Sequence, residues 1–348
     1  MDDLARPAGG GGTGRILPGT LAAGPLRRHK PGMASTDGGG GGGDGTGRGR
    51  MVVLGLGYAG AAAARDAARA GFAVVGTARD PAAAPPPPPG VALVAFDAAG
   101  DAIRDATHLL VTAAPGEGGD PVLAAHADPL AGARGLRWVG YLSTTGVYGD
   151  RGGAWVDEAT PPAPGQPRSA RRLAAEEAWR AALAGRAVAL DLFRVGGIYG
   201  PGRSPFDDLR AGGGGEGAAR RVLKPGHAFS RTHRDDIARA VLAAALAPAL
   251  GGTTRVLHLV DDEPSAQSDV VGEAARLLGL APPPAVPFEE ARARMSPMAL
   301  SFWLEDRKVA NAATKAALGG LRWLHPTYRE GLRAILAEER ADGAPEQA

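Results

Sequence analysis

The chain has 348 residues, a formal net charge of +2 at pH 7 and no cysteine. This length allows one large α/β domain with a smaller appendage, or two domains. The lack of cysteine excludes disulfides, thiolate metal sites and cysteine nucleophiles. No apolar run approaches the roughly 18 residues of a membrane-spanning helix, so we expect a soluble protein with no membrane partner.

The N-terminal segment, residues 1–50, holds seven Lys or Arg and four Asp, which leaves residues 51–348 close to neutral at −1. A neutral folded part argues against a nucleic-acid partner. The segment has no hydrophobic periodicity and contains an unbroken glycine run over residues 38–43, so we expect a disordered tail. The alternative is a targeting peptide, because residues 4–36 include basic residues and no acid. A disordered tail predicts a cytoplasmic protein, whereas a targeting peptide predicts a protein of a plastid or mitochondrion.

Ordered structure is expected from Met51, where an apolar run leads into a Gly-x-Gly-x-x-Gly sequence. An alanine-rich helix and a second apolar strand over residues 72–76 follow, which is the context of a dinucleotide-binding turn. Gly55 would make the tight turn, Gly57 would admit a pyrophosphate, and Gly60 would let the helix pack against the strand. The phosphates would accept from free amides at the helix N-terminus. We therefore assign cofactor contacts to Gly55, Gly57, Tyr58, Ala59 and Gly60.

Strand and helix signals then alternate as in a doubly wound parallel (Rossmann) sheet of the α/β class. Further strands are expected over residues 91–96, 108–112 and 136–142. At the end of the second strand, Ala78 stands where an acid would bind the ribose hydroxyls of NAD, and Arg79 follows it. A basic residue there accommodates the phosphate of NADP, so we expect NADP rather than NAD. The alternative is that Arg79 is a solvated loop residue.

Six motifs occur in order along the chain and together span about residues 51–335. They are residues 55–60 (GLGYAG), Asp97, and residues 143–149 (STTGVYG), 194–203 (RVGGIYGPGR), 231–238 (RTHRDDIA) and 258–264 (HLVDDEP). This set resembles the extended short-chain dehydrogenase/reductase superfamily, in its NAD-dependent epimerase/dehydratase group, and within it an atypical branch. We expect a Rossmann domain over residues 51–203 and 228–262, and a smaller substrate lobe over residues 204–227 and 263–340.

The resemblance implies roles for individual residues. The Thr144 hydroxyl would hydrogen-bond the reacting carbonyl or alcohol of the substrate. Further cofactor contacts, four at the adenine end and two beside the nicotinamide, would come from Asp97, Ala113, Ala114, Pro115, Gly197 and Ile198. Relatives act on small molecules, sugar nucleotides among them, and often dimerise, so the resemblance also implies a small-molecule substrate and a homodimer.

The active-site helix departs from the family. Members of the superfamily carry a proton-exchanging Tyr and, four residues later, a Lys that lowers the pKa of the phenol. On the helix expected over residues 169–182, Arg168 stands at the Tyr position and Arg172 at the Lys position, and no Tyr or Lys lies between residues 149 and 198. A guanidinium stays charged and cannot relay a proton, although Arg172 could still bind ribose hydroxyls.

An acid for the reaction would therefore come from elsewhere, and we predict Tyr148, with Tyr199 as the second candidate. The arginine pair, Arg168 and Arg172, has i and i+4 spacing and fits either an anionic group on the substrate or a solvated helix face.

His233 and His258 belong to motifs that act structurally in relatives, and Asp235 and Asp236 are expected to cap the helix entered at Ile237. The histidine spacing predicts no metal site.

The expected function is that of a NADP-dependent oxidoreductase or epimerase, with a degenerate active site, acting on a sugar nucleotide or another small carbonyl or alcohol compound. One alternative is a non-catalytic NADP(H)-binding regulatory or scaffold protein. Another is NADPH-dependent reduction in which water supplies the proton.

Overall fold

The computed structural model describes residues 47–211 and 220–342. The predicted disordered tail or targeting peptide lies almost entirely outside the described residues. Among the described residues, no helix combines the length and the apolar character needed to cross a membrane.

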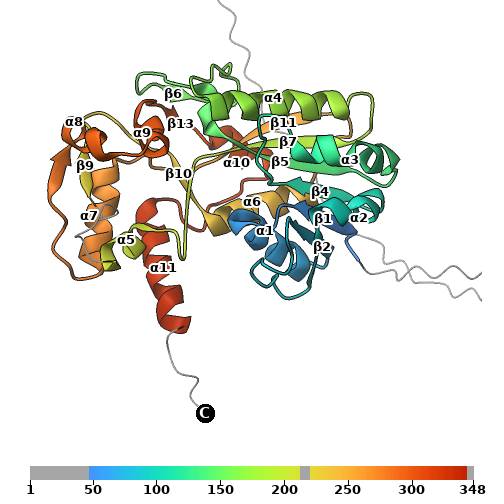
Figure 1. Cartoon of the computed structure of the whole chain (residues 1–348), viewed down its shortest axis with the longest axis horizontal. Helices are drawn as coiled ribbons and strands as arrows, with labels where there is room; N and C mark the ends of the chain where they lie inside the picture. The colour runs from blue at the N-terminus through green and yellow to red at the C-terminus, as the bar shows by residue number, and fades with distance from the viewer. Residues whose placement is uncertain (1–46, 212–219, 343–348) are drawn as a thin grey trace, which may run out of the picture. The chain divides into compact units, whose positions relative to one another are not determined.

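A seven-stranded parallel sheet forms the centre of the fold, with strand order β11-β7-β5-β4-β1-β2-β3 (Figure 1). The strands are β1 (Arg50–Leu54), β2 (Ala73–Ala78), β3 (Val91–Ala95), β4 (His108–Val111), β5 (Trp138–Thr144), β7 (Ala189–Val195) and β11 (Thr254–Leu259). The order reverses direction at β1, as in doubly wound folds. The predicted Rossmann fold is confirmed.

Helices cover both faces of the sheet, which explains why residues 51–54 of β1 are all apolar. Met51 and Val53 pack in one core with α1 (Tyr58–Arg69) and α6 (Arg234–Leu246). Val52 and Leu54 pack in a second core on the face covered by α2 (Gly100–Arg104), α3 (Pro121–Gly132) and α4 (Pro167–Ala182). Successive side chains of a strand point to opposite faces, so a strand covered on both sides must be apolar at every position.

Most of the remaining elements lie beyond the carboxyl edge of the sheet or in a smaller lobe (Figure 1), whereas α10 (Ala312–Ala317) lies alongside the edge strand β11. Three pairs of short strands are β6 (Trp155–Val156) with β13 (Lys308–Val309), β8 (Gly197–Tyr199) with β10 (Arg231–His233), and β9 (Arg221–Leu223) with β12 (Ala285–Pro287). The helices are α5 (Pro205–Arg210), α7 (Gln267–Leu277), α8 (Phe288–Ala291), α9 (Pro297–Trp303), α10 (Ala312–Ala317) and α11 (Tyr328–Asp342). Short 3-10 turns are η1 (Phe96–Ala98), η2 (Thr145–Tyr148) and η3 (Arg292–Arg294). The lobe has its own apolar cores, one of which joins α5, α7 and α11.

The start of α6 differs from the sequence expectation. Residues 231–233 form β10, and α6 begins at Arg234 with the His233 side chain accepting from the Asp235 amide at 3.2 Å. The Asp236 carboxylate instead accepts from the amides of Leu324 (2.6 Å) and His325 (3.0 Å). The prediction that Asp236 caps α6 is therefore wrong, because the carboxylate holds a distant loop against the helix.

Candidate functional site

The glycine turn after β1 has a conformation that only glycine adopts readily. Gly55 has φ = +105°, and a Cβ there would lie 2.7 Å from the Thr112 hydroxyl oxygen. A Cβ on Gly60 would lie 2.5 Å from the Gly55 carbonyl oxygen, closer than non-bonded atoms pack. The Thr112 hydroxyl donates to that same carbonyl. Two of the three glycines therefore allow close packing of the turn against β4 and α1.

Gly57 has a different environment, because a Cβ built there would meet nothing within 4 Å. It is the N-cap of α1, has φ −83° and carries no side-chain cap, and the first turn of the helix contains no acid. The amides of the first turn, at Tyr58 and Ala59, have no acceptor one turn back in the helix. The space above Gly57 is thus open and faced by hydrogen-bond donors, which fits a pyrophosphate.

The end of β2 lies beside this turn. The Thr77 carbonyl accepts from the Leu56 amide at 2.7 Å, and its hydroxyl accepts from the Gly55 amide at 2.9 Å. Arg79, two residues later, is exposed, and no described carboxylate forms an ion pair with it. Asp97 is likewise exposed, on η1. Both side chains are therefore free to meet a ligand at this edge.

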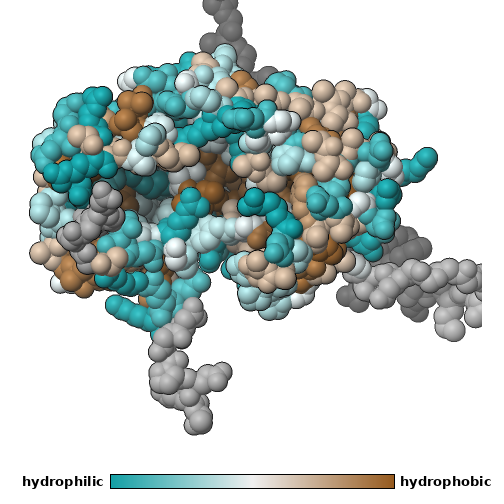
Figure 2. Space-filling view, in the orientation of Figure 1, coloured by the Kyte–Doolittle hydropathy of each residue, from teal (hydrophilic) through white to brown (hydrophobic). Residues whose placement is uncertain are grey.

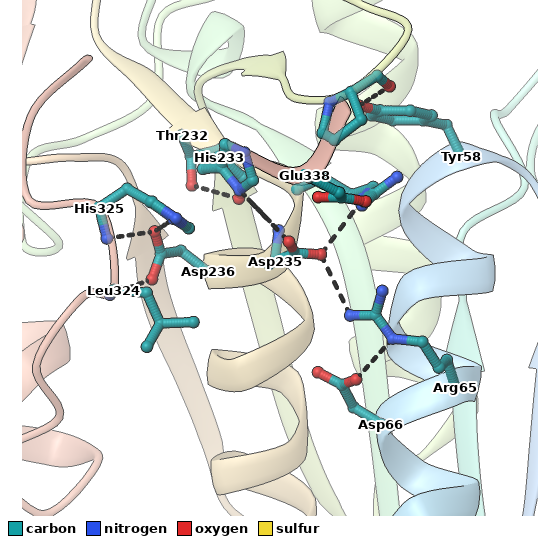
Figure 3. Close-up of polar contacts among 12 residues, drawn as sticks. Tyr58, Arg65, Asp66, Thr232, His233, Asp235, Asp236, Leu324, His325 and Glu338 are labelled. Carbon is teal, nitrogen blue, oxygen red and sulfur yellow. Dashed lines mark hydrogen bonds and ion pairs between the residues drawn. The ribbon is translucent and has the colours of Figure 1, made fainter. Parts of the chain in front are cut away.

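The loop after β4 and the strand β8 complete the predicted cofactor contacts. Ala114 is exposed and Ala113 and Pro115 are half-buried. Gly197 is exposed and Ile198 half-buried. Tyr58 donates from its hydroxyl to the Pro201 carbonyl at 2.9 Å (Figure 3), which ties the start of α1 to the loop that follows β8. These positions lie on segments at the carboxyl edge of the sheet, as expected for this architecture.

At the end of β5, the Thr144 hydroxyl oxygen accepts from the Gly146 amide at 3.0 Å, so its own hydrogen stays available to a substrate oxygen. Arg172, on α4, uses Nη1 to donate to the Leu142 carbonyl at 2.6 Å and to the Tyr141 hydroxyl at 3.3 Å. Burial raises the pKa of Tyr141 to about 12, although Arg172 opposes the shift. Arg172 thus holds the strand that presents Thr144, and its remaining N–H groups could meet a ribose.

Tyr148 does not have the environment of a proton donor to a substrate. Its side chain is fully buried, and its hydroxyl oxygen accepts from Arg194 Nη1 at 2.8 Å. The His258 Nδ1 lies 2.7 Å from the Ala310 carbonyl and must donate to it, so His258 Nε2 accepts from the Tyr148 hydroxyl at 2.5 Å. Burial raises the pKa of Tyr148 above its ordinary value, despite the neighbouring guanidinium of Arg194. This geometry argues against our prediction that Tyr148 is the catalytic acid.

The same network contains residues that the sequence analysis did not assign. Glu176, on α4, is fully buried, pairs with Arg194 Nη2 at 2.7 Å and accepts from the Ser143 hydroxyl. The network therefore joins β5, β7, β11 and α4, and it includes Ser143, the residue that precedes Thr144. The sequence did contain a signal for this pair. Glu176 lies in an alanine-rich helix and Arg194 in a largely apolar strand, and charged side chains are rarely buried unless they are paired.

Tyr199, the second candidate acid, is also buried and faces α11, since a Cβ on Gly331 would overlap its ring. Burial raises the pKa of Tyr199 far above its ordinary value. Neither tyrosine is therefore poised to exchange a proton at neutral pH.

Comparison with known proteins places the chain in a family. No protein-family model matches it. A solved protein of unknown function from Silicibacter pomeroyi is 41% identical, over 84% of this chain and 99% of that one, with a TM-score of 0.73. A Methylobacillus flagellatus protein, provisionally named an NAD-dependent epimerase/dehydratase, is 26% identical over 84% and 99% of the two chains, with a TM-score of 0.61. The 3-diazoavenalumate denitrifying reductase of a Streptomyces species is 31% identical over 228 residues, 60% of this chain and 68% of the reductase.

The chain belongs to the extended short-chain dehydrogenase/reductase superfamily. Within it, the chain falls in the NAD-dependent epimerase/dehydratase group. Two more distant structures share the fold: a human epimerase family protein with NADPH (18% identical, TM-score 0.62, 82% and 98% covered) and MoeE5 with UDP-glucose and NAD (21% identical, TM-score 0.65, 85% and 100% covered).

Compared with the superfamily pattern, Arg168 and Arg172 lie where the sequence analysis placed them, on α4 at the carboxyl edge of the sheet. Arg172 reaches the end of β5, whereas Arg168 turns to α9, with its guanidinium carbon 3.9 Å from the centroid of the Phe302 ring. The two arginines that the sequence analysis aligned with the superfamily's Tyr and Lys thus have different partners.

The fold also brings together His233, Asp236 and His325, with one potential ligand atom of each within 4.8 Å of the others (Figure 3). The sequence analysis predicted no metal site; His233 and Asp236 are three residues apart, and His325 lies 89 residues beyond Asp236. His233 Nδ1 accepts from the Asp235 amide, so the proton of the neutral ring lies on Nε2. Because a metal would require a lone pair on that nitrogen, the hydrogen bonding favours a structural role for the cluster.

Proposed function

We propose that this protein is a NADPH-dependent reductase that transfers hydride to a small substrate without a tyrosine acid. The observation that carries the proposal is the open, donor-faced space above Gly57, next to an exposed Arg79 that follows Ala78 at the end of β2. An acid would favour NAD there, whereas an unpaired guanidinium favours the additional phosphate of NADP. The NADPH-bound human relative supports the same choice, although MoeE5 holds NAD.

Bound NADPH would supply the hydride. In the site, Thr144 would donate its free hydroxyl hydrogen to an oxygen of the substrate, and Arg172 would donate to the nicotinamide ribose. Neither described tyrosine at this edge is free to give a proton, so water would supply it where the acceptor is a carbonyl. A reductase is favoured over an epimerase because epimerisation needs proton exchange in both directions, which the phenol normally provides, and because one relative is a reductase.

The second candidate, a NADP(H)-binding regulatory or scaffold protein without chemistry, is favoured by the burial of Tyr148 and by the two arginines on α4. It predicts the same cofactor affinity and no hydride transfer. The homodimer, and the boundaries given above for the domain and the lobe, remain predictions.

The test of the cofactor is calorimetric titration of the full chain with NADPH and NADH, together with Arg79→Ala. We expect NADPH to bind at least tenfold more tightly than NADH, and Arg79→Ala to remove most of that difference, because a charge-assisted contact contributes about 1.5–3 kcal/mol. Arg69→Ala is the matched control: it removes the same charge from an exposed side chain at the far end of α1. An equal effect of both variants, or tighter binding of NADH, would refute the assignment to NADPH.

A further inference from the structure

Arg168 lies at the substrate edge of the sheet, close to Thr144. A Cβ built on Gly146 would lie 2.6 Å from the hydroxyl oxygen of Ser169 and 3.2 Å from that of Thr144. The first turn of α4 therefore packs directly on the loop that carries Thr144. Arg168 precedes Ser169 on this turn, at the position that the sequence analysis aligned with the superfamily's tyrosine.

The guanidinium of Arg168 keeps most of its hydrogen-bonding capacity. Its guanidinium contacts α9: the carbon of the guanidinium lies over Phe302, and Nη1 is 3.1 Å from the sulfur of Met298. A thioether is a weak acceptor, and a guanidinium has five N–H donors. No carboxylate among the described residues forms an ion pair with Arg168. The half-buried Arg168 thus has no ion pair at this edge, since the carboxylate that acts on it electrostatically, Glu305, is paired with Arg307.

The side chains beside Arg168 are apolar and exposed. Met298 and Phe302 are 61% and 52% exposed, and their i, i+4 spacing places them on one face of α9. The next residue, Trp303, is buried and stacks on Phe288 in the core of the lobe. One side of α9 is therefore fixed in the lobe, while the other presents an apolar surface next to a guanidinium. The space-filling view shows a hollow between the elements of the lobe and those of the sheet (Figure 2).

We propose that Arg168, Met298 and Phe302 bind the substrate, and that the substrate is a flat, largely apolar carboxylate of the aryl-acid class. Stacking on Phe302 occupies one face of the guanidinium. The N–H groups of Arg168 point outward in the guanidinium plane, where a carboxylate can accept hydrogen bonds from two of them. The apolar part of such an acid would then lie along Phe302 and Met298 and cover surface that is now exposed. A sugar nucleotide would instead place sugar hydroxyls against these two side chains, which offer no donors.

This inference rests on the proposed reductase, since it puts the anchored acid beside Thr144, where a reducible group would meet the hydride. The carboxylate itself is not the reacting group. Its role is to hold the remainder of the substrate in one orientation, which accelerates a transfer between two bound partners.

The test is calorimetric titration of the NADPH-saturated full chain with 2-naphthoate, with its neutral analogue 2-naphthamide and with UDP-glucose. We expect 2-naphthoate to bind at least tenfold more tightly than either of the others. Arg168→Gln should weaken 2-naphthoate by about 10- to 100-fold, because it removes charge-assisted bonds. Phe302→Ala should weaken it severalfold. Arg171→Gln, the matched control, changes the neighbouring arginine of the same helix and should have no effect.

The affinity for NADPH is measured in each variant and should stay unchanged, and all titrations are repeated without NADPH. If NADPH does not bind, the proposed reductase is wrong, but the titrations without NADPH still test the carboxylate site. Tighter binding of UDP-glucose than of 2-naphthoate would overturn the inference. So would equal losses in Arg168→Gln and Arg171→Gln, or a change confined to thermal stability, which would mean that Arg168 only fastens α9 to α4.

Discussion

Replacement of Gly57 by alanine separates cofactor binding from folding. The new methyl group would enter space that no described atom occupies within 4 Å, at a residue whose φ of −83° suits alanine. Alanine restricts the unfolded chain more than glycine does, which would raise the free energy of unfolding by about 0.4–1 kcal/mol. Alanine is also a poorer N-cap than glycine, which would lower the free energy of unfolding by about as much. We therefore expect the free energy of unfolding to change by less than about 1 kcal/mol.

Binding of NADPH should respond strongly to the same change. A methyl group on Gly57 would stand between the backbone and the pyrophosphate and lengthen the bonds from the first-turn amides of α1. Loss of one charge-assisted bond costs about 1.5–3 kcal/mol, which corresponds to a roughly 10- to 100-fold weaker affinity.

Gly60→Ala is the contrasting variant, because its Cβ would lie 2.5 Å from the Gly55 carbonyl oxygen and should destabilise the fold by about 1–3 kcal/mol. Urea denaturation and calorimetry with NADPH measure both effects. Unchanged NADPH affinity in Gly57→Ala would show that no phosphate lies above Gly57 and would refute the reasoning.

Three further variants test the buried groups. Tyr148→Phe should lower the free energy of unfolding by about 1–3 kcal/mol, because it leaves Arg194 Nη1 and His258 Nε2 without their buried partner, and should leave NADPH affinity unchanged; a variant that folds normally and loses only turnover would restore Tyr148 as the acid. Glu176→Ala should cost about 3–5 kcal/mol in urea denaturation, since it leaves the buried charge of Arg194 unpaired, whereas the exposed Glu177→Ala should change little. Asp261 is buried, with neither carboxylate oxygen hydrogen-bonded to a described residue, and burial raises its pKa to about 8. The folded state therefore retains a proton that the unfolded state loses near pH 4, so stability should fall as pH rises towards 8. Asp261→Asn should flatten this dependence in thermal unfolding between pH 5 and 9, and an identical slope in both proteins would contradict the assignment.

The sheet and the glycine turn could be predicted because their signals are local. Residues 51–54 of β1 and 109–111 of β4 are continuous apolar runs covered on both faces, and each glycine of the turn lies within six residues of the others. β5 extends to Thr144, two residues further than predicted, because its polar end is paired with β7. The beginning of α6 was misplaced because the partner of Asp236 lies 88 residues away, at Leu324.

The surroundings of Tyr148 could not be predicted for a related reason. Its hydroxyl meets Arg194 and His258, 46 and 110 residues further along the chain, and only the strand order β11-β7-β5 makes them neighbours. The motif containing Tyr148 indicated its position near the substrate edge, but not whether the side chain points to the ligand or into the protein. The contact of Arg168 with α9 likewise depends on how the lobe packs on the sheet.

Hydride transfer is the measurement that tests the central claim most directly. The full chain would be incubated with NADPH carrying two deuterium atoms at C4 of the dihydronicotinamide and with a panel of aryl carboxylates bearing a reducible carbonyl or imine group, in which the deuteride forms a C–D bond that does not exchange with water. The account predicts a product with one deuterium by mass spectrometry, formed by the wild-type protein and by Tyr148→Phe, and strongly reduced in Gly57→Ala at a subsaturating NADPH concentration. Tight NADPH binding with no deuterium in any product would contradict a reductase and favour the non-catalytic NADP(H)-binding protein.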